Sequence, residues 1–205
     1  MSVVTQAQIM TVEKDAYASA GNTDVLSQPL TDSGNGERFV KLHGQDVRYC
    51  PEYKAWFVWD GKRWKRDRNG RARLMAKETA RRLYTDALAI PDSKERKEVE
   101  SHARRSENAK DIRATLECAR NEKGISVSAN DFDIEPWLLN CKNGTLDLHK
   151  RELRPHSRED LITKMCSVRF DKNATCPRFA KRPSSCASVA ATTARQLCSK
   201  RYGTF

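Results

Sequence analysis

The sequence predicts an α+β fold in which a β-hairpin, a helical middle and a second β-hairpin follow one another along the chain. Two dipeptides, Asp60-Gly61 and Asn143-Gly144, lie between stretches of strand-like residues. Such dipeptides favour tight hairpin turns because they readily adopt positive φ angles. Three stretches between them carry apolar residues at helical spacing. A disordered leader and a disordered tail are expected outside this core.

Size and composition allow one domain with its own core. The chain has 205 residues, of which 38% are hydrophobic and 32% are charged. We expect a leader over 1–29, a domain over 30–180 and an irregular basic tail over 181–205. No apolar run approaches the ~18 residues that a membrane span requires, and the first ten residues lack the pattern of a secretory signal. A cytoplasmic protein without membrane partners is therefore expected.

The first ordered element should be a short helix that Thr31 or Asp32 caps and Gly44 ends. Gly34 and Gly36 lie inside this stretch, but the Gly-Lys-Ser/Thr ending of a phosphate loop is missing. An extended piece, 47–50, then leads into the first hairpin, 56–65, with Asp60-Gly61 as its two-residue loop. The hairpin mixes tryptophans with lysines and arginines. Its tryptophans fit a buried core, and the alternative is a surface that stacks on bases.

Three helices should follow. The first covers 72–90 and stops before Pro91, the second runs from a cap at Asp92 or Ser93 to about 105, and the third begins at Ser106 or Glu107 and stops at Gly124. Arg73, Lys77 and Arg81 are spaced by four in the first helix, so they should share one face. That face either follows a phosphate backbone or is merely solvated.

The last third of the domain returns to strands. An extended piece, 125–127, precedes the second hairpin, 137–149, whose loop should be Asn143-Gly144. The chain then turns at 150–152. A turn capped by Ser157 and Asp160 leads into an apolar stretch, 161–165, that is expected to be a strand.

No residue pattern in the sequence identifies an active site. Asp131 and Asp133 resemble a metal-binding carboxylate pair, but turn residues precede them, which favours a capping role. The seven cysteines form no Cys-x-x-Cys pair, so we expect reduced thiols and no zinc site. His149 and His156 have no metal-ligating residue at a short spacing. We therefore expect no catalytic or metal-binding residue.

Charge points to a polyanionic partner. The formal net charge is +11, and residues 61–120 carry +8 of it. Nucleic acid is the commonest partner of such a basic protein. The candidate DNA-binding residues lie in the first hairpin and the helix after it: Lys62, Arg63, Trp64, Lys65, Arg66, Arg71, Arg73, Lys77 and Arg81.

Several stretches, in order, resemble one family. They include LTDSGNGERF at 30–39, WFVWDGKRW at 56–64 and WLLNCKNGTLDL at 137–148, followed by similar stretches up to residue 179. Together they resemble phage and plasmid primase–helicases. The resembling segment is the one that precedes the superfamily-3 helicase core in these proteins and in poxvirus-type primase–helicases. The resemblance implies a role in DNA replication of a mobile element in bacteria, with single-stranded or forked DNA as partner. It also implies self-assembly or contact with the helicase core.

The family's helicase core uses ATP and Mg²⁺, but this sequence has no Gly-x-x-x-x-Gly-Lys-Ser/Thr loop. We therefore assign no ATP-binding residue or cofactor and expect no ATPase activity. Residues 172–205 contain neither Asp nor Glu, which favours a chain truncated after about residue 179 with its tail read out of frame. The alternative is a natural basic tail for nucleic acid.

Three functions follow from these observations. The first is a DNA-binding or assembly domain of such a primase–helicase, without its own ATPase core. The second is a stand-alone basic DNA-binding adaptor. The third is a docking module for a partner protein that binds no nucleic acid.

Overall fold

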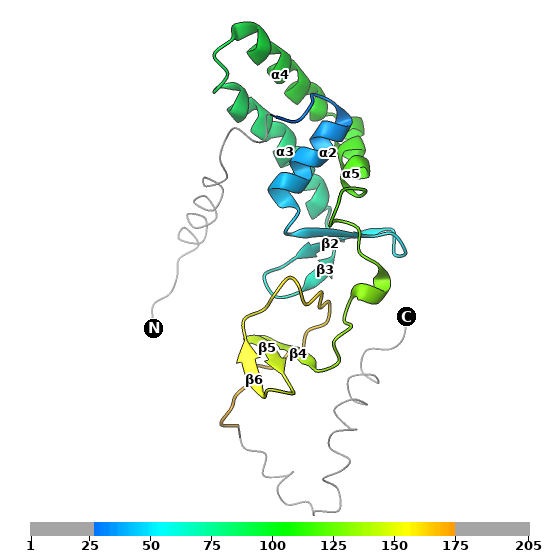
Figure 1. The fold of residues 1–205 in the computed structure, drawn as a ribbon, viewed down its shortest axis with the longest axis vertical. Helices are drawn as coiled ribbons and strands as arrows, with labels where there is room; N and C mark the ends of the chain where they lie inside the picture. Colours follow the sequence, from blue (N-terminus) through cyan, green and yellow to red (C-terminus); the bar gives the residue numbers. More distant parts are fainter. Residues whose placement is uncertain (1–26, 175–205) are drawn as a thin grey trace, which may run out of the picture. The chain divides into compact units, whose positions relative to one another are not determined.

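Four α-helices and two three-stranded antiparallel sheets make up residues 27–174, the part of the chain that the computed structural model describes (Figure 1). This architecture confirms the predicted α+β class. The chain divides into two units between Phe170 and Asp171, and every helix and strand named here belongs to the first unit. The predicted tail, 181–205, and residues 1–26 of the predicted leader lie outside the described residues.

Short polar side chains at the N-cap position begin helices α2 and α4. Thr31 accepts a hydrogen bond from the backbone of Gly34 at the start of α2, Asp32–His43, and Gly44 follows its last residue, as predicted. Helix α3 spans Arg71–Ala87. Asp92 caps α4, Ser93–Ser106, and Asn108 precedes α5, Ala109–Ala119.

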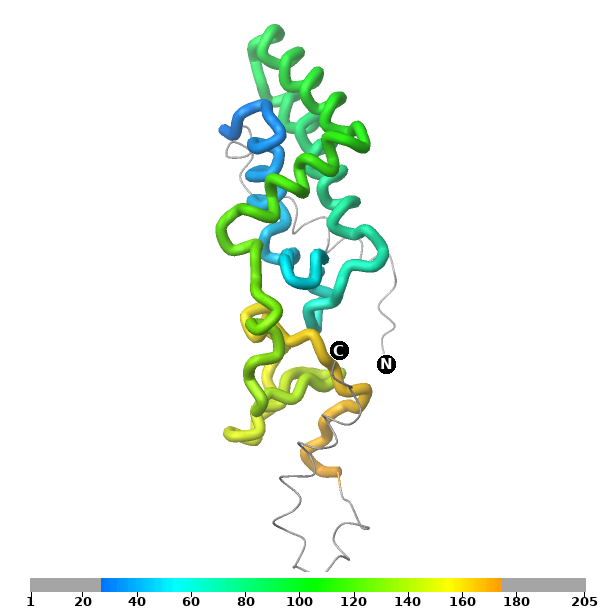
Figure 2. The backbone as a smooth tube through the Cα atoms, turned by 90° about the vertical axis from the view of Figure 1, so that its right-hand side faces the viewer, coloured from blue at the N-terminus to red at the C-terminus, as the bar shows by residue number. Residues whose placement is uncertain are grey.

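The predicted bounds of the third helix are wrong at both ends. Because α4 continues through Ser106, the chain must turn before α5 can begin at Ala109. At the other end α5 stops at Ala119, and Gly124, with a φ of 82°, lies in the turn that follows. Figure 2 follows the chain from α3 into α4, which pack together around a small core of their own: Leu83, Ala87, Ile90, Val99 and Ala103.

The first sheet consists of β1, Val47–Cys50, β2, Ala55–Trp59, and β3, Trp64–Arg66, in that order. Trp59 pairs with Trp64, so the hairpin loop has four residues, Asp60 to Arg63, and the predicted two-residue loop is wrong. The Asp60 carboxylate accepts hydrogen bonds from the backbone amides of Lys62 and Arg63, both at 3.0 Å. This side-chain turn stabilises a longer loop than the dipeptide alone indicates.

Both faces of the first sheet are covered. Val47 and Val58, on one face, pack against the helices in a core that includes Phe39 and Met75. Phe57 and Trp64, on the other face, pack against Phe132 and its neighbours. The aromatic residues of this hairpin are therefore mostly interior. The exposed side chains of the edge strand β3 are Lys65 and Arg66.

The second sheet consists of β4, Leu138–Cys141, β5, Gly144–Asp147, and β6, Glu152–Arg154. Cys141 pairs with Gly144, so the two loop residues lie one position earlier than predicted, at Lys142 and Asn143. The chain turns over residues 148–151, slightly earlier than the predicted 150–152, and Glu152 already belongs to β6, a strand that was not predicted.

The stretch 161–165 is not a strand, contrary to the prediction. The backbone amide of Thr163 donates to the side chain of Asp133 at 2.8 Å and not to a neighbouring strand. The stretch still lies against the first sheet, since the backbone of Trp64 donates to the Ile162 carbonyl at 2.8 Å.

Candidate nucleic-acid interface

Asp67 joins the edge strand β3 to the start of α3. One carboxylate oxygen accepts from the backbone amide of Arg71 and the other from that of Ala72, both at 2.9 Å. Gly70, at the N-cap position, has a φ of 72° and no side chain that could cap the helix. Asp67 thus satisfies amides that the first turn of a helix leaves without partners, and it fixes the angle at which strand and helix meet.

Five exposed cations lie around this junction, within nine consecutive residues. We call them the β3–α3 basic strip: Lys65, Arg66, Arg68, Arg71 and Arg73. Among the described residues none of the five forms an ion pair. Their charges are therefore available to an anionic partner. Arg68 was not among the candidates, although it lies in the same charged block.

The structure separates the remaining predicted cations. Lys62 is exposed in the hairpin loop. Arg63 is half-buried, lies 3.7 Å from Asp60 and donates to the Thr163 carbonyl, so it stabilises the loop.

The helix face predicted from four-residue spacing is not uniform. Arg73 is exposed, Lys77 is half-buried, and Arg81 forms an ion pair with Glu107 at 3.1 Å. Only the N-terminal part of that face belongs to the strip.

Trp64 is wholly inside the protein. Its exposed fraction is 0%, its indole N–H donates to the Arg158 carbonyl at 2.8 Å, and the guanidinium of Arg48 lies 4.9 Å from the centre of its ring. No face of the ring is open to a base. The prediction that Trp64 binds DNA is therefore wrong. The core role that large aromatic residues usually have is confirmed for this residue.

Tyr53 is the exposed aromatic residue of this region. It lies in the turn between β1 and β2, is 51% exposed, and its carbonyl accepts a hydrogen bond from the Arg66 side chain at 3.4 Å. Tyr53 was not among the predicted DNA-binding residues. Its position in a turn, beside Pro51 and Lys54, is the signal that could have indicated its exposure, since turns lie at the surface.

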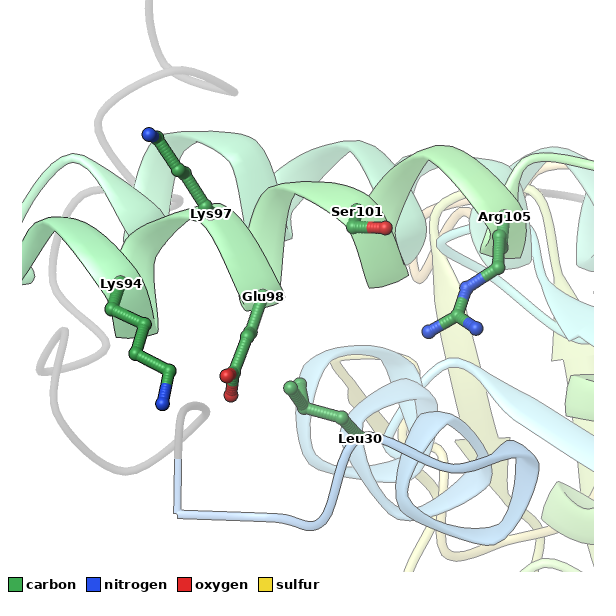
Figure 3. Close-up of a pocket in the computed structure, with 6 residues that line it drawn as sticks. All are labelled: Leu30, Lys94, Lys97, Glu98, Ser101 and Arg105. Carbon is green, nitrogen blue, oxygen red and sulfur yellow. The ribbon is translucent and has the colours of Figure 1, made fainter.

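A second group of cations lies on α4, around a shallow pocket of about 420 Å³. Figure 3 shows Lys94, Lys97 and Arg105 along the helix, with Glu98 and Ser101 between them and Leu30 on the opposite side. Because Glu98 lies among these cations, its negative charge weakens their attraction for phosphates. The group is therefore a useful surface for comparison with the β3–α3 basic strip.

The Asp131 carboxylate has the local capping role that the sequence indicated, whereas the Asp133 carboxylate bonds to a segment far along the chain. Asp131 accepts from the amide of Ser128 at 2.9 Å in a capping box, and Asp133 binds the 161–165 stretch. Within residues 27–174 no three His, Cys, Asp or Glu side chains gather as a metal site would require. In the same range no helix has the length and apolar content to cross a membrane.

A family model described as "D5 N terminal like" matches residues 36–182, which is more than half of the chain. The chain belongs to the D5 N-terminal-like family. D5 N-terminal-like domains are the N-terminal domains of phage-, plasmid- and poxvirus-type primase–helicases, so the predicted family is confirmed. The matched range of this D5 N-terminal-like domain includes the β3–α3 basic strip and both sheets. No curated protein matches the sequence.

Proposed function

We propose that this D5 N-terminal-like domain binds DNA through the β3–α3 basic strip, as part of a phage- or plasmid-type primase–helicase. The observation that carries this proposal is the set of five exposed cations, without ion-pair partners in the described residues, around the turn that Asp67 fixes. The family supports a replication role for the protein. The strip supplies the chemistry for the DNA contact.

Exposed cations bind DNA because each phosphate contact releases condensed counterions. An edge strand followed by a helix start offers such contacts along a short, fixed path. Tyr53 adds an exposed ring next to Arg66, and aromatic rings stack on unpaired bases of any sequence. We therefore propose single-stranded or forked DNA as the ligand, with Lys62 extending the basic surface into the hairpin loop.

The test compares two triple variants that each remove three positive charges. Lys65, Arg71 and Arg73 become Ala in the strip variant, and Lys94, Lys97 and Arg105 become Ala in the control. The affinity for a single-stranded oligonucleotide is measured by fluorescence anisotropy over a series of salt concentrations. Each lost phosphate contact should reduce the slope of log K against log salt by about 0.7.

We expect the strip variant to lose about two units of slope and the control to lose much less. Equal losses in the two variants would mean that only the overall charge matters. An unchanged slope in the strip variant would contradict the proposal, and circular dichroism spectra of both variants check that they are folded.

A docking module is the second candidate, and exposed apolar side chains favour it. Ile134 is 64% exposed, Trp137 48% and Val168 61%. Exposed apolar side chains can contact other proteins where they gather on one surface. If the chain binds no single-stranded oligonucleotide but self-associates in sedimentation velocity, and if changing Ile134 and Val168 to Ser abolishes the association, this second function holds.

A further inference from the structure

Two cysteines meet where a chain segment returns to the second sheet. Cys141 is the last residue of β4, and Cys166 lies in the return segment, which we define as residues 161–168. The backbone amide of Cys166 donates to the Asn140 carbonyl at 2.7 Å, and the amide of Lys142 donates to the Val168 carbonyl at 3.1 Å. The return segment therefore runs alongside Cys141, in the same direction as β4.

The first of these bonds places Cys166 beside Cys141, and the second shows that the return segment continues in the same direction with its register shifted by two residues. In a parallel pair, a residue that donates to a carbonyl is the neighbour of the residue after that carbonyl. Neighbouring strands lie about 4.8 Å apart, and disulfides join residues whose Cα atoms are about 4.4–6.8 Å apart. The side chains agree with this placement, because burial and then the charge of Cys166 raise the pKa of the Cys141 thiol.

We propose that Cys141 and Cys166 form a reversible disulfide when the protein meets a small-molecule disulfide such as oxidised glutathione. The Cys166 thiolate attacks one sulfur of the oxidant and expels the first glutathione thiolate, which gives a mixed disulfide. Cys141, as thiolate, then attacks Cys166 Sγ and releases the second glutathione. Two thiol protons are lost, and the oxidant takes up two electrons.

Exposure sets the order of these steps. Cys166 is half-buried, so an oxidant can reach it, whereas Cys141 is 4% exposed and is placed only to attack a neighbour. The other two cysteines of the described residues lie elsewhere in the fold. Cys50 is buried in β1 with its thiol donating to Glu52 at 3.3 Å, and Cys118 lies on α5.

The bond would fasten the return segment to the second sheet. The same region supports the first hairpin, because Asn140 Nδ2 donates to the Lys62 carbonyl at 2.9 Å and to the Lys164 carbonyl at 3.2 Å. Oxidation is therefore expected to stabilise the contact between the two sheets. This inference does not depend on DNA binding.

The experiment uses the full chain, treated with oxidised glutathione and then with iodoacetamide to block the remaining thiols. Trypsin should release peptides 124–142 and 165–169, which carry Cys141 and Cys166. We expect mass spectrometry to find these two peptides joined, at the combined mass less two hydrogens, and separated again by dithiothreitol. Oxidation should raise Tm by about 5 °C, since the closed loop restricts the unfolded chain.

Matched variants decide the assignment. Cys166→Ala should abolish both the joined peptide and the rise in Tm, and Cys118→Ala should retain both. Cys141→Ala should leave Cys166 as a mixed disulfide with glutathione. The proposal is overturned if the two peptides stay separate in the wild type, if Cys166 joins another cysteine instead, or if Cys166→Ala keeps the rise in Tm.

Discussion

The side chain of Asp67 accepts a hydrogen bond from the backbone amide of Ala72 at 2.9 Å, across the junction between β3 and α3. The same carboxylate accepts from Arg71 at 2.9 Å and from Asn69 at 3.1 Å. One acidic residue thus organises the turn that carries five exposed cations. The Asp67 carboxylate bonds to backbone amides and not to the cations around it, which remain exposed to solvent.

Asp67→Ala should destabilise the protein by about 1–2 kcal/mol, because the start of α3 loses its cap. The free energy of unfolding is measured by urea titration. Asp67→Asn should recover part of the loss, since the amide oxygen still accepts. Glu78→Gln removes an exposed acidic charge from the same helix and should change stability by less than about 0.5 kcal/mol. Equal effects from the Asp67→Ala and Glu78→Gln changes would rule out the capping role.

Trp64→Phe should lower the free energy of unfolding by about 1–2 kcal/mol, because the buried indole loses its hydrogen bond to the Arg158 carbonyl and part of its volume. The variant should bind DNA with the same salt slope as the wild type, since the ring is not exposed. Tyr53→Ala is the complementary variant, and it should weaken binding to single-stranded DNA with little loss of stability. The opposite pattern would return Trp64 to the DNA interface.

Gly36→Ala should destabilise the protein by about 1–3 kcal/mol, although alanine is the better helix former. A Cβ atom at Gly36 would lie 2.7 Å from Cys118 Cβ and 3.0 Å from the backbone nitrogen of Ala119, so α2 and α5 would have to move apart. Thermal unfolding measures the change. Ser33→Ala, at an exposed position of the same helix, is the control and should be nearly neutral. A gain in stability from Gly36→Ala would show that the two helices are not in close contact.

Stability should fall as the pH drops from about 6.5 to 4. Burial lowers the pKa of His43 to about 4, and its usual value is 6.5. The unfolded chain therefore binds a proton at His43 more readily than the folded protein does in this range. The stability that neutral His43 contributes is complete above pH 6.5 and is lost as the pH falls towards 4. The pKa shift corresponds to about 3 kcal/mol at most.

His43→Gln tests this assignment through urea unfolding at several pH values. The variant should lose stability less steeply between pH 6.5 and 4 than the wild type, whatever its stability at pH 7. Burial also lowers the pKa of His102, so some dependence on pH should remain. Identical slopes in variant and wild type would contradict the role of His43.

Local signals in the sequence predicted the helix starts well where a cap is formed by neighbouring residues. Thr31 and Asp92 are examples, because each bonds to an amide two or three residues away. The predicted hairpin loops were one or two residues in error, since loop length depends on the register of whole strands. At the first loop, Asp60 also bonds to two amides within the turn.

The sequence by itself determined the α+β class, the order of the elements, the family and the basic block. These properties depend on composition, periodicity and short-range capping, all of which can be read along the chain. Only the tertiary structure decided which residues of the block are exposed. It buried Trp64 under Arg48, paired Arg81 with Glu107 and left Tyr53 at the surface. Burial depends on residues far apart in the sequence, and alternation within one hairpin does not show that both faces of its sheet are covered.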